Sequence, residues 1–139
     1  MKARAVKGLD RAAPLRPNAE RIVRTRLEEV RSLVPAALEP SASTAQHDLR
    51  IAAKRLRYVL EIAGPCFGAE AKAVRDAAKR LQGVLGDIHD CDVMLARGED
   101  IESLCTLLRT RRELLFRQFS DLWQAVSPTL HTFSLHRGE

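Results

Sequence analysis

Apolar residues recur every three or four positions in four successive segments of the chain, which is the spacing of one buried face of an α-helix. The first segment predicts a helix over 17–34, with Pro17 at a first helical position and Pro35 and Pro40 beyond the end. A kinked extension to Leu38 fits the same pattern. No segment alternates apolar and polar residues over a useful length, so we expect no strands.

The second helix is predicted to start at Ser43, because Ser43 and Gln46 have the spacing of a capping box, and to stop at Gly64. The third and fourth helices are predicted over 69–96 and 101–126. Four amphipathic helices with short connections predict an all-α fold, an antiparallel four-helix bundle. The residues expected inside are Leu49, Ala53, Leu56, Leu60 and Ala63, then Val74, Ala78, Leu81, Leu85 and Ile88, then Leu104, Leu108, Leu115, Phe119, Leu122 and Val126.

The composition is that of one globular domain: 139 residues, 45% hydrophobic and 29% charged. We divide it into a basic N-terminal arm (1–16), the helical bundle (17–127) and a C-terminal tail (128–139). Three cysteines without a C-x-x-C pair argue against a disulfide framework or a zinc site, and we expect them to be small core residues. No run of residues is apolar enough to cross a bilayer, which predicts a cytoplasmic protein without membrane contact.

The formal net charge of +5 favours an anionic partner, and the cations are arranged in stripes. At about 100° per residue, one arc of the second helix carries a histidine and three cations, opposite its apolar stripe. The third helix repeats the arrangement. Guanidinium groups at this spacing can make forked contacts with phosphate oxygens, so the two stripes predict a phosphate-binding groove. Their residues are His47, Arg50, Lys54 and Arg57, followed by Lys72, Arg75 and Lys79.

A short turn at 64–68 makes the second and third helices antiparallel neighbours. Pairing about the centre of this turn places His47 near Asp87 and puts two mid-helix glycines, Gly83 and Gly86, across from the first turns of the second helix. Because a mid-helix glycine costs about 0.8–1 kcal/mol relative to alanine, two of them indicate clearance for large side chains or for a ligand. We expect Asp87 or Asp90 to hydrogen-bond the histidine or its neighbouring arginine.

The fourth helix supplies further cations. Arg111 falls within the apolar arc of this helix, and Arg112 lies beside it. An inward arginine needs a partner, and Asp92 is the expected one for Arg111.

Metal binding and catalysis find little support in the sequence. Asp87, His89, Asp90 and Asp92 have the residue types of metal ligands, but on a helix at most two of them converge on one point. No serine or cysteine lies in a nucleophile motif. We therefore expect no metal, no other cofactor and no enzymatic activity.

Two segments, HDLRIAAKRLRYVL at 47–60 and LQGVLGDIHDCDVM at 81–94, resemble the CHAD family of conserved-histidine α-helical domains, known as polyphosphate-binding modules. They match the pattern H-x-x-R-x-x-x-[KR]-R-x-R followed by L-x-x-x-L-G-x-x-x-D-x-D. Weaker similarity lies in KGLD of the arm and in RTRRELLFRQFSDLW of the fourth helix. The resemblance implies that polyphosphate is contacted by His47, Arg50, Lys54, Arg55 and Arg57, with support from Asp90 and Asp92.

Family members commonly contain two helical halves around a basic channel, whereas the His-x-x-Arg motif occurs once here. The chain then works as an open half-site or as a homodimer, for which Ile51, Tyr58 and Ile62 on the flank of the second helix are candidate interface residues. Some relatives associate with storage granules, a location that the resemblance extends to this chain.

The sequence thus predicts a non-enzymatic module that binds inorganic polyphosphate, or another polyanion, in a basic groove of helices two, three and four. RNA or DNA is the alternative ligand, although an aromatic content of 4% offers few bases a stacking partner. A metal-dependent phosphohydrolase is the alternative enzyme. The predicted binding residues are His47, Arg50, Lys54, Arg55, Arg57, Lys72, Arg75, Lys79, Arg111 and Arg112, with Asp87, Asp90 and Asp92 in support.

Overall fold

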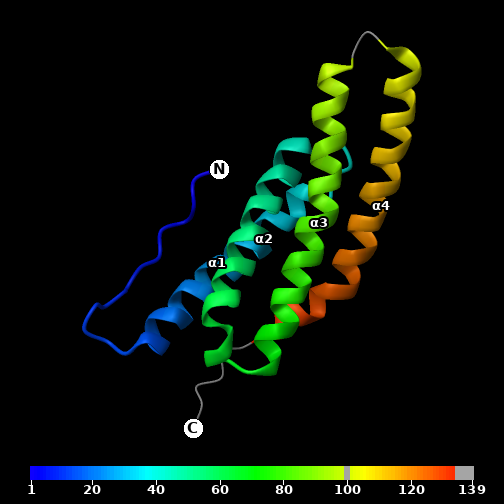
Figure 1. Ribbon diagram of the computed structural model, residues 1–139. Helices are drawn as coiled ribbons and strands as arrows, with labels where there is room; N and C mark the ends of the chain where they lie inside the picture. Colours follow the sequence, from blue (N-terminus) through cyan, green and yellow to red (C-terminus); the bar gives the residue numbers. More distant parts are fainter. Residues whose placement is uncertain (99–100, 134–139) are drawn as a thin grey trace.

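The computed structural model describes residues 1–98 and 101–133, and within them the predicted all-α bundle is confirmed. Successive helices run in opposite directions, with α1 and α2 on one side and α3 and α4 on the other (Figure 1). A short 3-10 turn, η1, follows α2 directly. The elements are α1 (Leu15–Ala37), α2 (Ser43–Ala63), η1 (Gly64–Cys66), α3 (Ala69–Arg97) and α4 (Glu102–Thr132).

Two helices continue through a proline: α1 takes the extension that its sequence pattern allows, and α4 is longer than predicted. Helix α1 contains Pro35 and ends at Ala37, and α4 contains Pro128 and ends at Thr132. Residues 128–132, expected in the tail, are therefore helical. A proline inside a helix removes one backbone hydrogen bond. At the end of α4 the burial of Leu130, whose side chain is fully inaccessible, offsets that loss.

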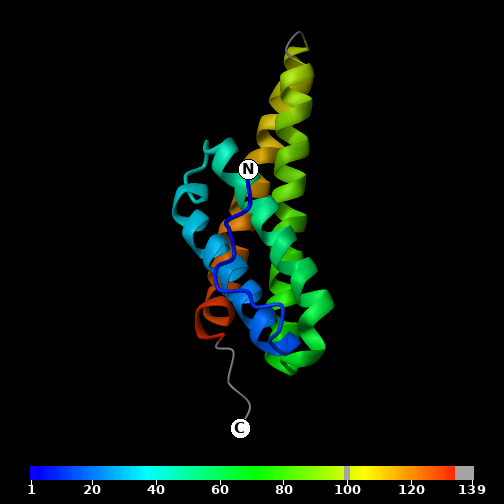
Figure 2. The ribbon, with the colours of Figure 1, turned by 90° about the vertical axis from the view of Figure 1, so that its left-hand side faces the viewer.

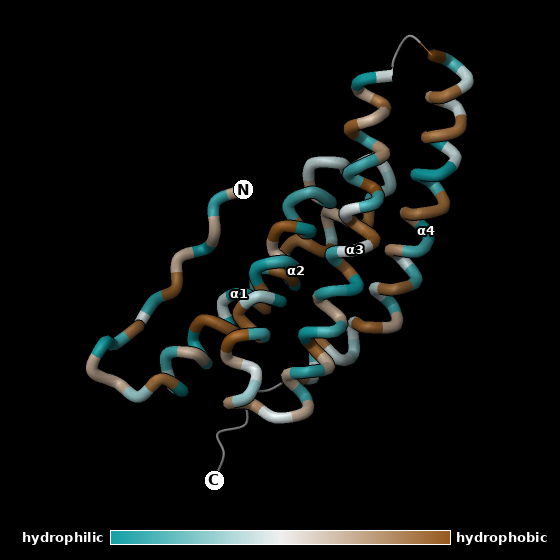
Figure 3. The backbone as a smooth tube through the Cα atoms, in the orientation of Figure 1, coloured by the Kyte–Doolittle hydropathy of each residue, from teal (hydrophilic) through white to brown (hydrophobic). Residues whose placement is uncertain are grey.

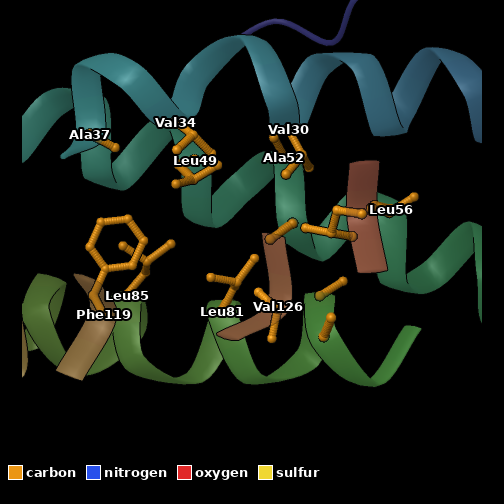
Figure 4. Packing of buried hydrophobic residues seen from close by; sticks show 14 of the residues in the cluster. Val30, Val34, Ala37, Leu49, Ala52, Leu56, Leu81, Leu85, Phe119 and Val126 are labelled. Atoms are coloured by element: carbon orange, nitrogen blue, oxygen red, sulfur yellow. The ribbon is translucent and has the colours of Figure 1, made fainter. Parts of the chain in front are cut away.

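The core lies where α1 and α2 face α3 and α4. Val34 of α1 lies beside Leu49 of α2 and Val30 beside Ala52, and across from them Leu85 of α3 packs beside Phe119 of α4 (Figure 4). Most residues predicted inside are buried, including all five of α3. The exceptions are Ala63, Leu104, Leu122 and one predicted core cysteine, Cys66, all of which are half-buried.

Helices α3 and α4 extend beyond α1 and α2 as a two-helix hairpin (Figures 1 and 2). Apolar segments continue along α4 into this projection (Figure 3). On α4, Leu107 and Leu114 are 66% and 52% exposed. The projecting turns of α4 have only α3 beside them, so their apolar arc is covered on one side alone. No helix of the described ranges has the length and apolar character that a bilayer crossing requires.

The N-terminal arm lies against the outside of α1 and α2 (Figure 2). Its backbone is held at Arg4, whose amide donates to Oε2 of Glu29 at 3.1 Å, and at Asp10, whose amide donates to Oδ1 of Asn18 at 3.0 Å. At Gly8 the backbone has φ +79°, a conformation that residues with a Cβ rarely adopt, so the turn favours glycine. The arm is thus attached along the bundle.

The predicted capping box is wrong. Ala42 is the N-cap of α2 and no side chain caps the helix. Gln46 is instead buried, and its Nε2 donates to the carbonyls of Ala37 and Glu39 at 3.2 and 3.0 Å. The glutamine satisfies the end of α1, whose last carbonyls have no helical partner, rather than the start of its own helix.

Candidate functional site

The turn between α2 and α3 sets which residues of the two helices meet. Helix α2 continues into η1, and Gly68, with φ +78°, reverses the chain into α3. The His47 ring lies on His89, with centroids 4.4 Å apart and planes at 30°. This register differs by two residues from the predicted one, which placed His47 at Asp87, because the hairpin turns about Gly68 and not one residue earlier.

The same register brings Arg50 against Gly86. A Cβ added at Gly86 would lie 3.9 Å from Cδ of Arg50, in ordinary contact, whereas one added at Gly83 would meet nothing within 4 Å. Neither position therefore needs glycine to avoid a clash within the protein. The clearance for a ligand that the two glycines suggest stays a prediction.

We define the basic face as the predicted stripes of α2 and α3. The four α2 members are half-buried, and two of them, His47 and Arg50, lie against α3 at His89 and Gly86. On α3 two of the three lysine and arginine members are exposed, and Arg75 forms an ion pair of 3.3 Å with its neighbour Asp76. The basic face consists of His47, Arg50, Lys54 and Arg57 of α2 and Lys72, Arg75 and Lys79 of α3.

Buried polar atoms without hydrogen-bond partners are concentrated at the basic face. They are Nδ1 of His47, Nε of Arg50, Nε of Arg57 and Oε1 of Gln82, and among the described residues a fifth such atom, Nε of Arg31, lies elsewhere. Native structures pair about nine in ten buried polar groups, and an unpaired one costs about 1–3 kcal/mol. Four such atoms on two facing helices mark a region in which the protein leaves its own polar groups unsatisfied.

Arg57 shows how little the protein offers these groups. Its Nε lies 3.4 Å from Oε1 of Glu61, an ion pair without hydrogen-bond geometry, and the Glu61 side chain is 47% exposed. The guanidinium also lies over the ring of Tyr58, 4.7 Å from its centroid. Exposed ion pairs contribute little to stability, so Arg57 remains available to an external anion.

The electrostatics of the basic face act against a charge on His47. Burial lowers its pKa below the ordinary 6.5, and His89 and Arg50 lower it further. Asp48 opposes them, and the amino group of Met1 adds a smaller effect in the same direction as the other cations. The unliganded protein thus favours a neutral His47, in a positive surrounding that an anion would relieve.

The predicted hydrogen bonds from α3 aspartates to this face are wrong. Within the described residues, neither Asp87 nor Asp90 bonds to His47 or Arg50, and both aspartates are exposed. The shifted register explains the difference, because it puts His89 where Asp87 was expected. The metal-ligand types on α3 do not converge either: no group of three His, Cys, Asp or Glu side chains suited to a metal ion occurs in the described ranges.

The inward arginine of α4 is Arg112, and the prediction that Arg111 occupies this position is wrong. Arg111 is exposed, whereas the Arg112 side chain is only 14% exposed and its Nε donates to Asp92 at 2.5 Å. The buried stripe of α4 runs through Leu108 and Leu115, with Arg112 between them. Leu107, an apolar residue on the same side of α4 as Arg111, is exposed and lies outside this stripe.

Arg112 also joins α4 to the beginning of α2. Its terminal nitrogens donate to Oε1 of Gln46 at 2.6 Å and to the Pro40 carbonyl at 2.8 Å. Gln46 is the residue before His47. The predicted support from Asp92 is therefore indirect: Asp92 holds Arg112, and Arg112 fixes the turn from which the basic face begins.

Arg55 points to the opposite side of α2 from the basic face. Its Nη1 donates to Oε1 of the buried Glu29 at 3.2 Å, and its Nη2 donates to the Met1 carbonyl at 2.7 Å. Arg26 binds the other carboxylate oxygen of Glu29 at 2.7 Å. The structure thus places Arg55 in the contact between α1, α2 and the arm.

Comparison with known proteins agrees with this geometry. The CHAD domain model matches residues 2–99, which comprise the arm, α1, α2, η1 and α3. This chain belongs to the CHAD family. No curated protein and no solved structure matches it. CHAD domains are known as polyphosphate-binding modules, and in this member the basic face lies wholly within the matched residues.

Sequence reasoning missed two members of the site. His89 was set aside with the metal-ligand types, although its place beside His47 follows once the hairpin register is known. Gln82 carries an unpaired buried oxygen between the two stripes, and its position on the arc of Lys72, Arg75 and Lys79 was the available signal.

Proposed function

We propose that the basic face binds inorganic polyphosphate without chemically altering it. His47, Arg50, Lys54 and Arg57 contact the anion from α2, and the α3 cations contact it from the facing helix. Arg55 and Arg112 act from outside this contact, because their guanidinium groups are engaged with Glu29 and Asp92. Arg111 contributes to the long-range positive field.

The observation that carries the proposal is the set of unpaired polar atoms on this face. Three are nitrogens of His47, Arg50 and Arg57, at i, i+3 and i+10 on one helix. A protein that needed these groups for folding would pair them, as it pairs Arg55 and Arg112. Phosphate oxygens are the natural partners of guanidinium and imidazolium donors. At 1.5 Å per residue the three side chains are spread over about 15 Å of helix, which suits a chain of phosphates better than one.

Nucleic acid is the second polyanion to test. A single-strand binder needs exposed rings for base stacking. Tyr58 is the one tyrosine of the chain, and its ring is already covered by the Arg57 guanidinium. In the described part of the chain, Tyr58 therefore offers at most one free ring face beside the basic face, which favours an anion without bases.

A competition assay separates the ligands. Fluorescently labelled long-chain polyphosphate is displaced by unlabelled polyphosphate, by tripolyphosphate or by RNA of equal charge. We expect long polyphosphate to compete best, and log K to fall with log salt with a slope near −0.7 per neutralised phosphate, the value for single-stranded nucleic acid. Preferential displacement by RNA, or an affinity independent of salt, contradicts the proposal.

Gel analysis of the same polyphosphate tests the absence of chemistry. Incubation with the protein and Mg²⁺ or Mn²⁺ should leave the chain length unchanged. Metal-dependent shortening by the pure protein would favour the phosphohydrolase instead.

We further propose that two copies can enclose one polyphosphate chain. The proposed ligand also leads us to propose that the protein works in the cytoplasm, at polyphosphate granules. Tyr58 and Ile62, on the flank of α2 beside the basic face, are 46% and 85% exposed and offer apolar surface for such a contact. Sedimentation with and without polyphosphate tests this arrangement. A dimer in either condition supports it, and a monomer in both contradicts it.

A further inference from the structure

His47 and His89 form a close pair of imidazoles at one end of the basic face. Their centroids are 4.4 Å apart, and Nδ1 of His47 is buried without a hydrogen-bond partner. No carboxylate of the described residues hydrogen-bonds to either ring. Two rings at this distance cannot both carry a charge without strong repulsion, and nothing in the protein compensates even one charge fully.

The charged groups around the pair come from every neighbouring element. Helix α2 contributes Arg50 and Asp48, which act in opposite directions, and the arm contributes the Met1 amino group. On α3, Asp87 and Asp90 flank His89 along the chain but point to solvent. On α4, Arg112 is neutralised by Asp92. The balance disfavours a proton on His47 in the unliganded protein.

We propose that His47 and His89 form a proton-linked pair, which takes up a proton when a polyanion occupies the basic face and releases it when the polyanion leaves. The inference rests on the proposed function, because the compensating negative charge comes from the ligand. His89 thereby becomes a determinant of the pH at which the face binds. A phosphate oxygen supplies the acceptor that Nδ1 of His47 lacks, and its charge stabilises the imidazolium.

This linkage makes affinity depend on pH in a defined direction. Binding raises the proton affinity of the pair, so acidification must strengthen binding. Each unit by which the ligand raises the pKa of the pair gives up to a tenfold increase in affinity as the pH falls through that range. The lowered pKa of His47 in the unliganded protein supports this direction, because it leaves the ring neutral and able to accept the proton.

Calorimetry with long-chain polyphosphate, whose internal phosphates stay ionised, measures the linkage directly. Titrations near pH 7 in two buffers of different ionisation enthalpy give the number of protons taken up. We expect net uptake by the natural protein and none by His47→Gln. His89→Phe keeps a ring against His47 but removes its charge, so the pH at which binding strengthens should move upward. His131→Gln is the control, because His131 contacts Trp123 at the far end of α4.

The outcomes distinguish this inference from the proposed function. If the natural protein binds polyphosphate with no proton uptake and with equal affinity from pH 8 to pH 5.5, the proton-linked pair is wrong and the proposed function stands. If His89→Phe leaves the pH profile unchanged while His47→Gln abolishes proton uptake, His47 acts alone and the pair is again wrong. If no polyphosphate binds at any pH, the proposed function itself fails.

Discussion

Basic side chains on the two sides of α2 differ in their hydrogen bonding. Toward α1, Arg55 meets a buried carboxylate and a backbone carbonyl, and every donor around Glu29 has an acceptor. Toward α3, Arg50 and His47 have buried nitrogens without partners. On the side toward α1 the polar groups have partners within the protein, and we call this the completed side of α2. On the side toward α3 buried polar groups lack partners, and we call this the incomplete side.

This difference shows how a basic helix divides its cations between folding and binding. A guanidinium paired inside the protein stabilises the fold and has little left for a ligand. A guanidinium without a partner costs stability and keeps its donors for an external anion. The sequence motif, with Lys54, Arg55 and Arg57 in one run, does not tell a paired cation from an unpaired one. The residue that each cation faces on the neighbouring helix makes this distinction.

The largest effect is expected where the completed contact is broken. Glu29→Ala leaves Arg26 and Arg55 without their carboxylate and removes the acceptor of the Arg4 amide in the arm. Breaking a buried ion pair on one side costs about 3 kcal/mol, which for a chain of this size lowers the melting temperature by roughly 10 °C. Urea unfolding and thermal melting measure the loss. Glu28→Ala is the matched control, because Glu28 is exposed and forms no ion pair with a described residue.

A loss close to that of the exposed neighbour would show that the buried carboxylate contributes little. The completed side of α2 would then be no more stabilising than the incomplete one.

The next effect concerns the attachment of α4. Arg112→Met removes donors to Asp92, Gln46 and Pro40, and charge-assisted bonds of this kind predict a loss of about 2 kcal/mol. Arg111→Met, one residue earlier on the exposed side, should change stability by less than about 0.5 kcal/mol. Chemical denaturation of both variants tests the assignment. Equal losses, or a larger one for Arg111→Met, would favour the inward position that the sequence pattern gave to Arg111.

The incomplete side should respond in affinity and not in stability. Arg50→Gln and Arg57→Gln each remove one charge-assisted contact, which predicts about a tenfold weaker binding of polyphosphate. Because both arginines have an unpaired buried nitrogen, the melting temperature should stay the same or rise slightly. Polyphosphate titration and thermal melting are measured on the same samples. Arg109→Gln, an equal loss of charge on exposed α4, controls for the general positive field.

A fall in melting temperature with unchanged affinity would reverse the comparison. Arg50 and Arg57 would then be structural residues, like Arg55.

The sequence was sufficient for the helices and for the stripe of cations, because both depend on the helical period alone. The ends of α1 and α4 were set by tertiary packing that outweighs the cost of Pro35 and Pro128. The pairing of α2 with α3 depends on one residue of turn geometry at Gly68, and a small error there exchanged His89 for Asp87.

Whether Arg111 or Arg112 points inward depends on which part of α4 packs against other elements besides α3. Apolar residues at the projecting end of α4 widen its arc beyond the part that α3 covers. The helical spacing of the apolar residues therefore predicted the buried stripe of α4 only to within one residue. Unpaired polar atoms belong to three-dimensional packing and have no signal in the sequence.

The smallest expected effect is the pH dependence of stability without ligand, and its sign follows from His47. The folded protein lowers the pKa of this histidine below 6.5, so the unfolded chain binds the proton more tightly. Stability attributable to His47 is therefore complete above pH 6.5 and falls as the pH drops through 6.5 toward the lower folded value. Urea midpoints of the natural protein and of His47→Gln between pH 8 and pH 5.5 isolate this contribution, because all other groups are shared.

The natural protein should lose more stability on acidification than the variant, and saturating polyphosphate should reduce or reverse the difference. A natural protein that gains stability relative to the variant on acidification without ligand would mean that His47 already has a partner for its proton, and the incomplete side of α2 would be complete at that position.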